Sequence, residues 1–355
     1  MRRFLTLVGL TIACVVTCAA TVWARDRHTP AGARHRHSSS AGRRRRARHH
    51  RRSSHHKRDS HHQRRRHHHH KKKKKKTRGP STGTTTSTPV AGGAAAPPDP
   101  CPSGPPGATA SLGGHTYALE GMDTFTKNAP LGSFAQSSAS QIVYTGDHGM
   151  QWTGYPDGWP STYSGSAEGY QPSTVLSVHD GMLDFHLHND AQGHPVGANP
   201  SPLPGGNHYQ TYGAWSFCER VAPGAQGLAD FHQAPLLWPS NDSDWASAES
   251  DFPESGLNSS DFSGFAHYGG SGSQDAYDVQ SVMPSFDPTQ WHVYTQTWGP
   301  GFRSYFVDGR LVGTSTSDVW SQPERWQLQM EPSGTNDGDS GDVYVKWVWI
   351  GTFSS

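Results

Sequence analysis

The sequence has few cysteines, and helical hydrophobic periodicity is hard to find in it. Of its four cysteines, Cys14 and Cys18 lie inside an apolar N-terminal run. The remaining pair, Cys101 and Cys218, predicts one disulfide in an oxidising compartment. The sequence contains no glycine-rich phosphate-binding loop and no serine in a convincing nucleophile elbow, so nucleotide chemistry and serine hydrolysis are without support. After the N-terminal run, no segment is long and apolar enough to cross a membrane.

Positive charge is scarce from Cys101 onward and crowded before it. Residues 101–355 contain 6 Lys and Arg against 26 Asp and Glu, a net charge of −20. Residues 25–78 contain 23 Lys and Arg against 2 Asp, a net charge of +21, together with 13 His. Because they have almost no apolar side chains to form a core, we expect them to be a disordered basic arm. After export the arm should bind anionic cell-wall polymers or surfaces, and no specific nucleic acid is expected.

The N-terminus has the pattern of a secretory signal. Arg2 and Arg3 precede the apolar run, and small residues ending at Ala24 suit a cleavage site. A retained membrane anchor is the alternative, because the run is long enough to span a bilayer. We therefore divide the chain into four segments: a signal peptide at 1–24, the basic arm at 25–78, a Pro/Gly/Ser/Thr linker at 79–100 and a folded domain at 101–355. This organisation predicts a secreted protein that associates with the cell wall.

Strand signals are frequent in the folded domain. Asp180-Gly181 and Asp308-Gly309 each separate two short apolar runs, which predicts two β-hairpins. A last strand is expected at 343–350. The residues expected on one face of that strand are Val343, Val345, Trp347 and Trp349. Many short strands punctuated by Gly and Pro predict an all-β fold, a β-sandwich of two antiparallel sheets.

Three carboxylates gather in one short segment. Side chains alternate between the faces of a strand, so Glu249 and Asp251 point the same way. Glu254 points the other way unless one extra residue resets the phase. Pro253 cannot donate to the sheet ladder and is therefore our candidate for a bulged residue. All three acids then share one face. Two carboxyl groups that flank a bond, one protonated and one ionised, are what glycoside hydrolysis requires.

The segment Glu249-Ser-Asp251-Phe-Pro-Glu254 resembles the Glu-x-Asp-x-x-Glu signature of glycoside hydrolase family 16. Flanking segments that also resemble the family are Tyr212-Gly213 with Arg220, Leu236–Pro239, Phe265–Tyr268, Trp291–Tyr294 with Thr297-Trp298, Val307–Gly309 and Val345–Val348. The resemblance covers residues 115–353. It implies a concanavalin A-like jelly roll, with a sugar-binding cleft across the concave sheet.

The resemblance also implies a role for each acid. Glu249 is the nucleophile, Glu254 is the general acid and base, and Asp251 holds the nucleophile in orientation. Retaining hydrolysis needs two carboxyl groups about 5–5.5 Å apart, so that one attacks the anomeric carbon while the other protonates the leaving oxygen. Ser250 departs from the family, which usually has a bulky apolar residue there. It shares with Phe252 the face opposite the acids, and a buried hydroxyl needs a hydrogen-bond partner.

Aromatic side chains are the expected sugar platforms, because the C–H faces of a pyranose pack on flat rings. The chain has 12 Trp. Those assigned to the core are Trp298, Trp347 and Trp349. The candidates for substrate contact are Trp238, Trp215, Trp245, His267, Tyr268 and Arg220. Core packing explains any one of these aromatic residues equally well, and a structural role explains His267 equally well.

The sequence predicts no cofactor and no firm metal site. Residues 336–342 place oxygen ligands at alternating positions, as a calcium loop does, but an acidic surface turn is favoured because the rest of the loop pattern is missing. Asp184, His186 and His188 share one strand face and could hold a metal, although a solvated polar edge is favoured.

We therefore predict a secreted, monomeric, retaining endo-glycosidase that acts on a β-glucan with β-1,3 or mixed β-1,3/1,4 linkages. The linkage rests on the commonest activities of the family, and red-algal galactans are alternative substrates. A transglycosylase is a close variant, because the covalent intermediate can be passed to a sugar. A non-catalytic carbohydrate-binding protein is the alternative from another class, and Ser250 is the one feature in its favour.

Overall fold

The computed structural model describes residues 101, 104–161, 169–224, 227–333 and 338–355. The expected signal peptide, basic arm and linker lie outside these residues. Within the described part, no helix is both long and apolar enough to span a membrane. Five short helical segments occur among the described residues: α1 (Pro172–Val175), η2 (Pro204–Gly206), η3 (Asp242–Asp244), α2 (Trp245–Ala248) and η4 (Val279–Ser281).

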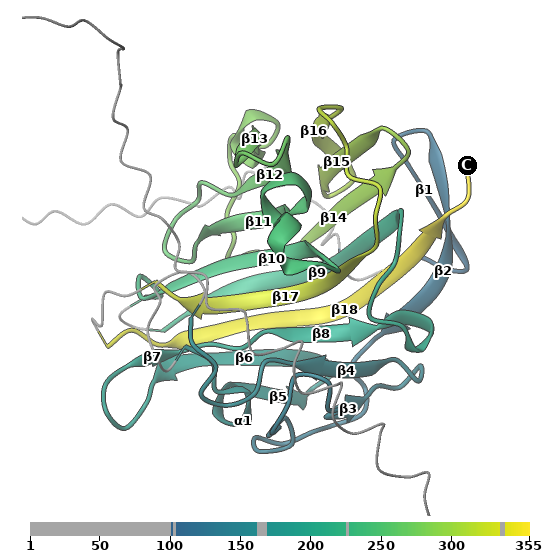
Figure 1. Ribbon diagram of the computed structural model, residues 1–355. Helices are drawn as coiled ribbons and strands as arrows, with labels where there is room; N and C mark the ends of the chain where they lie inside the picture. The colour runs from purple at the N-terminus through teal and green to yellow at the C-terminus, as the bar shows by residue number, and fades with distance from the viewer. Residues whose placement is uncertain (1–100, 102–103, 162–168, 225–226, 334–337) are drawn as a thin grey trace, which may run out of the picture. The chain divides into compact units, whose positions relative to one another are not determined.

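The larger sheet is antiparallel and follows the order β1–β2–β18–β9–β14–β15–β16, with β5, β6 and β7 attached beside β18 (Figure 1). Its ten strands in the described part are β1 (Thr109–Leu112), β2 (His115–Asp123), β5 (Leu176–His179), β6 (Met182–Asn189), β7 (Pro195–Val196), β9 (Gly213–Pro223), β14 (His292–Gly299), β15 (Phe302–Val307), β16 (Arg310–Ser315) and β18 (Gly341–Phe353). One edge of the long β18 pairs with β9 along nearly its whole length, and the other edge is shared by β2 and β6.

A second sheet follows the order β13–β12–β11–β10–β17. Its strands are β10 (Phe231–Pro239), β11 (Ser250–Gly256), β12 (Ser263–Tyr268), β13 (Ser273–Asp278) and β17 (Glu324–Pro332). A small third sheet contains β3 (Tyr144–Thr145), β4 (Gln151–Gly154) and β8 (Pro200–Leu203). The third sheet continues the second one beyond β17. Ala198 and Met330 exchange backbone hydrogen bonds of 2.9 Å, and the Ser201 hydroxyl donates to the Trp326 carbonyl at 2.7 Å.

The two larger sheets pack face to face around an aromatic core. Phe217 on β9 contacts Trp326 on β17 with ring centroids 5.6 Å apart, and Phe252 on β11 contacts Tyr305 on β15 at 5.2 Å. All four side chains are buried. Alternating residues of each strand therefore point into the sandwich, as the period of two requires. The predicted all-β sandwich is confirmed, and the second sheet has a face turned away from this core.

Both predicted hairpins form. Asp180 and Gly181 join β5 to β6 with φ of 52° and 71°, and Asp308 and Gly309 join β15 to β16 with φ of 49° and 73°. Two successive residues with positive φ define the turn whose twist suits a two-residue hairpin, which is why Asp-Gly pairs favour it.

The predicted single face of the last strand is wrong. A bulge in β18 places two residues, 345 and 347, against consecutive partners on β9. Val343 and Val345 therefore point into the sandwich core, whereas Trp347 and Trp349 point to the opposite face. A one-residue slip moves every later side chain to the other face of a sheet. Trp298 and both of these Trp are nevertheless buried, as expected.

The predicted disulfide between Cys101 and Cys218 is present. It closes a loop across 117 residues and ties the start of the described domain to β9. The two cysteines pack with Tyr117, Trp347 and Trp349 in a second apolar cluster, separate from the core between the sheets. Because the cross-link restricts the unfolded chain over a long loop, it should contribute several kcal/mol to stability, about 5 kcal/mol in the entropic model.

Candidate functional site

The three acids are brought together by an extra residue in β11. Pairing with β12 passes from Asp251–Phe265 to Glu254–Ser263, which is three steps on β11 against two on β12. Pairing with β10 shifts by one residue over the same stretch. The peptide between Phe252 and Pro253, inside this stretch, is cis. The bulge predicted at Pro253 is therefore confirmed, and it turns Glu254 to the face that carries Asp251.

We call this face of the second sheet the acid face. The Glu249 side chain, immediately before β11, is 18% exposed, Asp251 is 4% exposed and Glu254 is 29% exposed. Ser250 and Phe252 lie on the opposite face and are buried in the sandwich. The outer two acids can therefore meet a ligand, while the middle one is enclosed.

Burial and mutual repulsion raise the pKa of two of these acids. The pKa of Glu249 rises to about 8, first because burial disfavours its charge and then because Glu254, Glu331 and Glu324 are negative. The pKa of Asp251 is raised well above its ordinary value by burial and by its two acidic neighbours. Among these crowded carboxyls the most enclosed one holds its proton best, so a proton on Asp251 permits negative charge on Glu249.

His267 on β12 lies beside this pair. Its Nε2 atom is 4.0 Å from Glu249 Oε2 and 3.9 Å from Asp251 Oδ2, and its backbone N–H donates to the Glu249 carbonyl at 2.9 Å. Burial lowers the pKa of His267, an effect to which Arg303 adds and which Glu254 opposes. A neutral imidazole is thus favoured between the acids. The predicted site residue His267 lies on the acid face, although these separations exceed a hydrogen bond.

Ser250 has the hydrogen-bond partners that a buried hydroxyl requires. Its Oγ lies 2.7 Å from the Tyr305 hydroxyl and donates to Gln296 Oε1 at 3.3 Å. Tyr305 in turn donates to the Phe265 carbonyl at 2.6 Å, which links β15 to β12 beneath the acid face. A Cβ atom on Gly264 would lie 2.8 Å from the Tyr305 ring, so the close packing of this ring requires glycine there. The polar residue at position 250 therefore belongs to a buried network under the motif strand.

Sequence reasoning did not find His232 on β10, which faces Glu254. Its Nε2 atom is 3.4 Å from Glu254 Oε1, and its Nδ1 atom is 3.9 Å from Oε1 of Glu331 on β17. The side chains of His232 and Glu331 are only 10% and 3% exposed. The sequence did contain a signal for His232. Side chains alternate along β10, and His232 lies an even number of residues from Trp238, a predicted site residue, so both point to the same face.

Two predicted sugar platforms border the acid face. Trp238 is half-buried at the end of β10 and donates from Nε1 to Asp242 at 2.7 Å. Trp245 in α2 is 39% exposed, and its ring centroid lies 5.9 Å from that of His267. Both rings retain surface that a sugar could cover, unlike a ring in the core.

Three other predicted contacts lie elsewhere. Trp215 on β9 is buried in the sandwich core beside Trp298, so it has no surface to offer. Arg220 also lies on β9, where its guanidinium stacks 5.0 Å from the Trp291 ring centroid, on the face of the larger sheet opposite the core. Tyr268 follows His267 directly and so points away from the acid face. The structure therefore places Trp215, Arg220 and Tyr268 off the acid face, contrary to expectation, because a resemblance in sequence does not define the face of each strand.

Several solved structures have a fold similar to that of the described domain. An endo-β-1,3-glucanase from Pyrococcus furiosus aligns with 70% of this chain and 99% of its own, at a TM-score of 0.50 and 16% sequence identity. SCLam, a non-specific endo-β-1,3(4)-glucanase from family GH16, aligns with 69% of this chain and 94% of its own, also at a TM-score of 0.50 and 16% identity. The described domain shares its fold with these two solved structures. No family model matches the sequence, and no curated protein matches it significantly.

The acid face continues onto β17 as a row of polar side chains. The residues of this row, all buried, are Arg325, Gln327, Gln329 and Glu331. They alternate with Trp326, Leu328 and Met330, which point into the core. Strict alternation of polar and apolar residues is visible in the sequence and could have identified this strand. Phe265, opposite Asp251, is a half-buried aromatic ring on the same face that sequence reasoning also missed.

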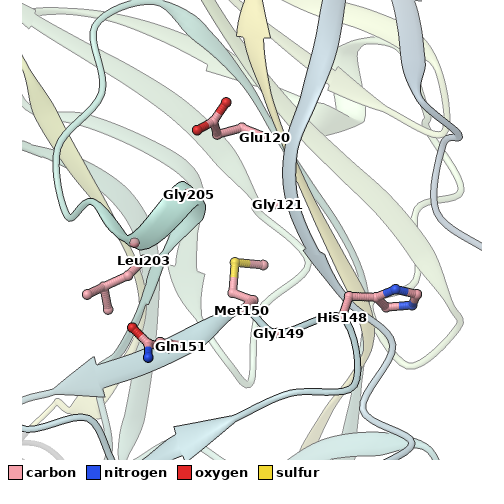
Figure 2. Close-up of a pocket in the computed structure, with 9 residues that line it drawn as sticks. Glu120, Gly121, His148, Gly149, Met150, Gln151, Leu203 and Gly205 are labelled. Carbon is pink, nitrogen blue, oxygen red and sulfur yellow. The ribbon is translucent and has the colours of Figure 1, made fainter.

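A pocket of about 220 Å³ lies away from the acids (Figure 2). Its labelled side chains include Glu120, His148 and Gln151, from β2, the turn after β3 and β4. None of its nine lining residues belongs to the acid face. Its size alone does not make it the catalytic site, since glycosidase chemistry needs paired carboxyls.

Within the described residues, no group of three or more His, Cys, Asp and Glu has the arrangement of a metal site. Asn336 and Asp337 of the suggested calcium loop lie outside the described part. Asp339 accepts a hydrogen bond of 2.6 Å from the Ala229 backbone. His186 pairs with Asp342 at 2.8 Å instead of meeting Asp184.

Proposed function

We propose that this chain is a secreted, retaining endo-glycosidase that hydrolyses a β-glucan with β-1,3 or mixed β-1,3/1,4 linkages. The observation that carries the proposal is the bulge in β11, which gathers Glu249, Asp251 and Glu254 on one face. Two half-buried acids flank a third that is enclosed. The glucanase fold supports the same chemistry, and the named activities of the two structural neighbours support the choice of substrate.

In the first half of the reaction, the Glu249 carboxylate attacks the anomeric carbon and the glycosidic C–O bond breaks. Glu254 passes its proton to the leaving oxygen at the same time. In the second half, Glu254 takes a proton from water, which attacks the anomeric carbon and releases Glu249. A protonated Asp251 donates a hydrogen bond to Glu249 and so stabilises its ionised form.

We propose that the basic arm at 25–78 attaches the enzyme to anionic cell-wall polymers after export. Its net charge of +21 supports non-specific binding that weakens as salt rises. A protein that starts at residue 79 should lose wall binding at low salt and keep its turnover. Retention of wall binding by that protein would contradict the proposed role of the arm.

The test of the enzyme itself uses the intact protein and a panel of β-1,3, mixed-linkage and galactan polysaccharides. Reducing ends are measured for the wild type, Glu249→Gln and Glu219→Gln. Glu249→Gln should lower turnover by about 10⁴-fold or more, as removal of a nucleophile does in other hydrolases. Glu219 is a buried acid on β9 and serves as the matched control, so its variant should keep turnover per folded molecule.

The outcomes of this test distinguish the proposed function from its alternatives. Turnover of β-glucan that only Glu249→Gln abolishes supports the proposal, and turnover of galactan alone changes the substrate. Longer products in the presence of acceptor sugars would indicate transglycosylation. Binding to a polysaccharide without any turnover would favour the carbohydrate-binding alternative, for which Ser250 no longer argues because its hydroxyl is satisfied in the core.

A further inference from the structure

His232 lies between two carboxyl groups that come from different strands. Glu254 on β11 is 3.4 Å from its Nε2 atom, and Glu331, its partner in the β10–β17 register, is 3.9 Å from its Nδ1 atom. The imidazole is 10% exposed, so neither contact depends on a freely rotating surface side chain. The imidazole that faces the proposed acid and base is thus itself held in a fixed environment.

Hydrogen bonds from neighbouring side chains fix the carboxylate of Glu331. The Tyr170 hydroxyl donates to its Oε2 atom at 2.8 Å, and the Gln329 amide donates to its Oε1 atom at 3.0 Å. The Asn199 amide donates to Gln329 at 3.1 Å, which extends the chain of hydrogen bonds to the segment before β8. These donors fix a carboxylate 3.9 Å from Nδ1 of His232, which is longer than a hydrogen bond but close enough for its charge to act on the buried ring.

We propose that His232 is a positioning residue for Glu254, and that Glu331 holds its imidazole ring for this task. The proposal rests on the function proposed above for Glu254. In the reacting complex Nε2–H donates to Glu254 Oε1, which lies 3.4 Å away in this structure, and the proton that moves in catalysis is left on Oε2. In the first step this proton passes from Oε2 to the leaving glycosidic oxygen. In the second step Oε2 takes a proton from the attacking water, and the proton on Nε2 stays in place throughout.

A test by leaving group separates positioning from general damage. Aryl glycosides of the sugar that the wild type cleaves are compared, one with a poor leaving group that needs protonation and one with dinitrophenolate, which leaves without it. His232→Leu should lower kcat/KM for the poor leaving group by about 10–100-fold, as expected for a misplaced catalytic group. It should change kcat/KM for the activated substrate by less than about threefold, because that step asks nothing of Glu254.

Two further variants sharpen this test. His232→Gln retains an amide donor near the position of Nε2 and should recover part of the loss. His292→Gln removes a buried histidine that pairs with Asp308 at 2.8 Å on the larger sheet, and it should leave the leaving-group dependence unchanged. An equal loss on both substrates in His232→Leu would overturn the positioning role.

A measurement on the resting protein does not depend on turnover. The side-chain ¹⁵N signals of His232, assigned by their absence in His232→Gln, are compared by NMR at one fixed pH. Glu254→Gln should change the Nε2 signal and Glu331→Gln the Nδ1 signal, because each variant alters the carboxyl group that faces that ring nitrogen. Signals that stay unchanged in both variants would overturn the proposal. If the signals change but no polysaccharide or aryl glycoside is cleaved, the contact stands and the proposed enzymatic function fails.

Discussion

Two glutamates with similar pKa values occupy very different regions of this molecule. Burial raises the pKa of Glu249 on the acid face and of Glu219 on β9 to about 8 in each case. Glu219 is 1% exposed inside the sandwich, where the neighbouring Gln233 only partly offsets the effect of burial. Glu249 is 18% exposed and is crowded by other acids. A raised pKa therefore does not identify a catalytic acid unless the group is also accessible and paired with a second carboxyl.

The largest effect expected from this comparison is on the pH dependence of stability. A folded pKa of about 8 against 4.5 for the unfolded chain means that Glu219 costs no stability below pH 4.5, costs progressively more between pH 4.5 and 8, and costs a constant amount above that. Glu219→Gln should therefore gain stability relative to the wild type over that window, by up to about 5 kcal/mol. Urea unfolding at pH 5 and pH 9 measures the difference, and parallel pH curves for the two proteins would contradict it.

Substitutions of Trp215 and Trp238 should separate the role of the core in stability from the role of the acid face in substrate binding. Trp215→Ala removes a buried ring beside Trp298 and should lower the free energy of unfolding by about 3–5 kcal/mol. Trp238→Ala removes a half-buried ring and should raise KM by about tenfold, which corresponds to ~1.4 kcal/mol of lost stacking. Thermal unfolding and KM are measured on both variants. KM does not depend on how much of the protein is folded, so a rise in KM in Trp215→Ala would mean that this ring does contact sugar.

The acid limb of the pH–rate profile tests the raised pKa of Glu249. The nucleophile must be ionised, so kcat/KM should fall as pH drops through that pKa, well above the ordinary 4.5. Glu331→Gln removes one of the negative charges that raise the pKa and should move the limb to lower pH by about one unit or less. Glu219→Gln is the control and should leave the limb in place.

The sequence was sufficient to predict that the three acids share one face, because the signals for this are local. Alternation and the poor fit of Pro253 in a ladder predicted the bulge that unites three acids, and two Asp-Gly pairs predicted two hairpins. The face of each β9 residue was not predictable in this way. Arg220 and Trp215 follow the same strand but point to opposite sides of the larger sheet, and only the packing of the whole sandwich decides which side is core.

The same limit applies wherever two contacting groups are far apart in the chain. His232 and Glu331 face each other because β10 pairs with β17, a register that no nearby residue encodes. The bulge in β18 likewise moved Trp347 and Trp349 to the second apolar cluster, although their spacing from Val345 suggested one continuous face. Long-range pairing therefore decided the parts of the site and core that local patterns could not.

The smallest expected effect concerns Ser250, which lies in the same strand as the acids but on the core side. Ser250→Ala should lower the free energy of unfolding by about 1 kcal/mol, because one buried hydrogen-bonding group is lost while Tyr305 keeps its bond to the Phe265 carbonyl. A double-mutant cycle with Tyr305→Phe should give a coupling of at least about 0.5 kcal/mol, since the two hydroxyls contact each other directly. Turnover should change by less than about threefold, because the acids lie on the other face. A large loss of turnover with unchanged stability would show that side chains on the core side of β11 affect the catalytic activity of the acids. The core and the acid face would then not be functionally separate regions.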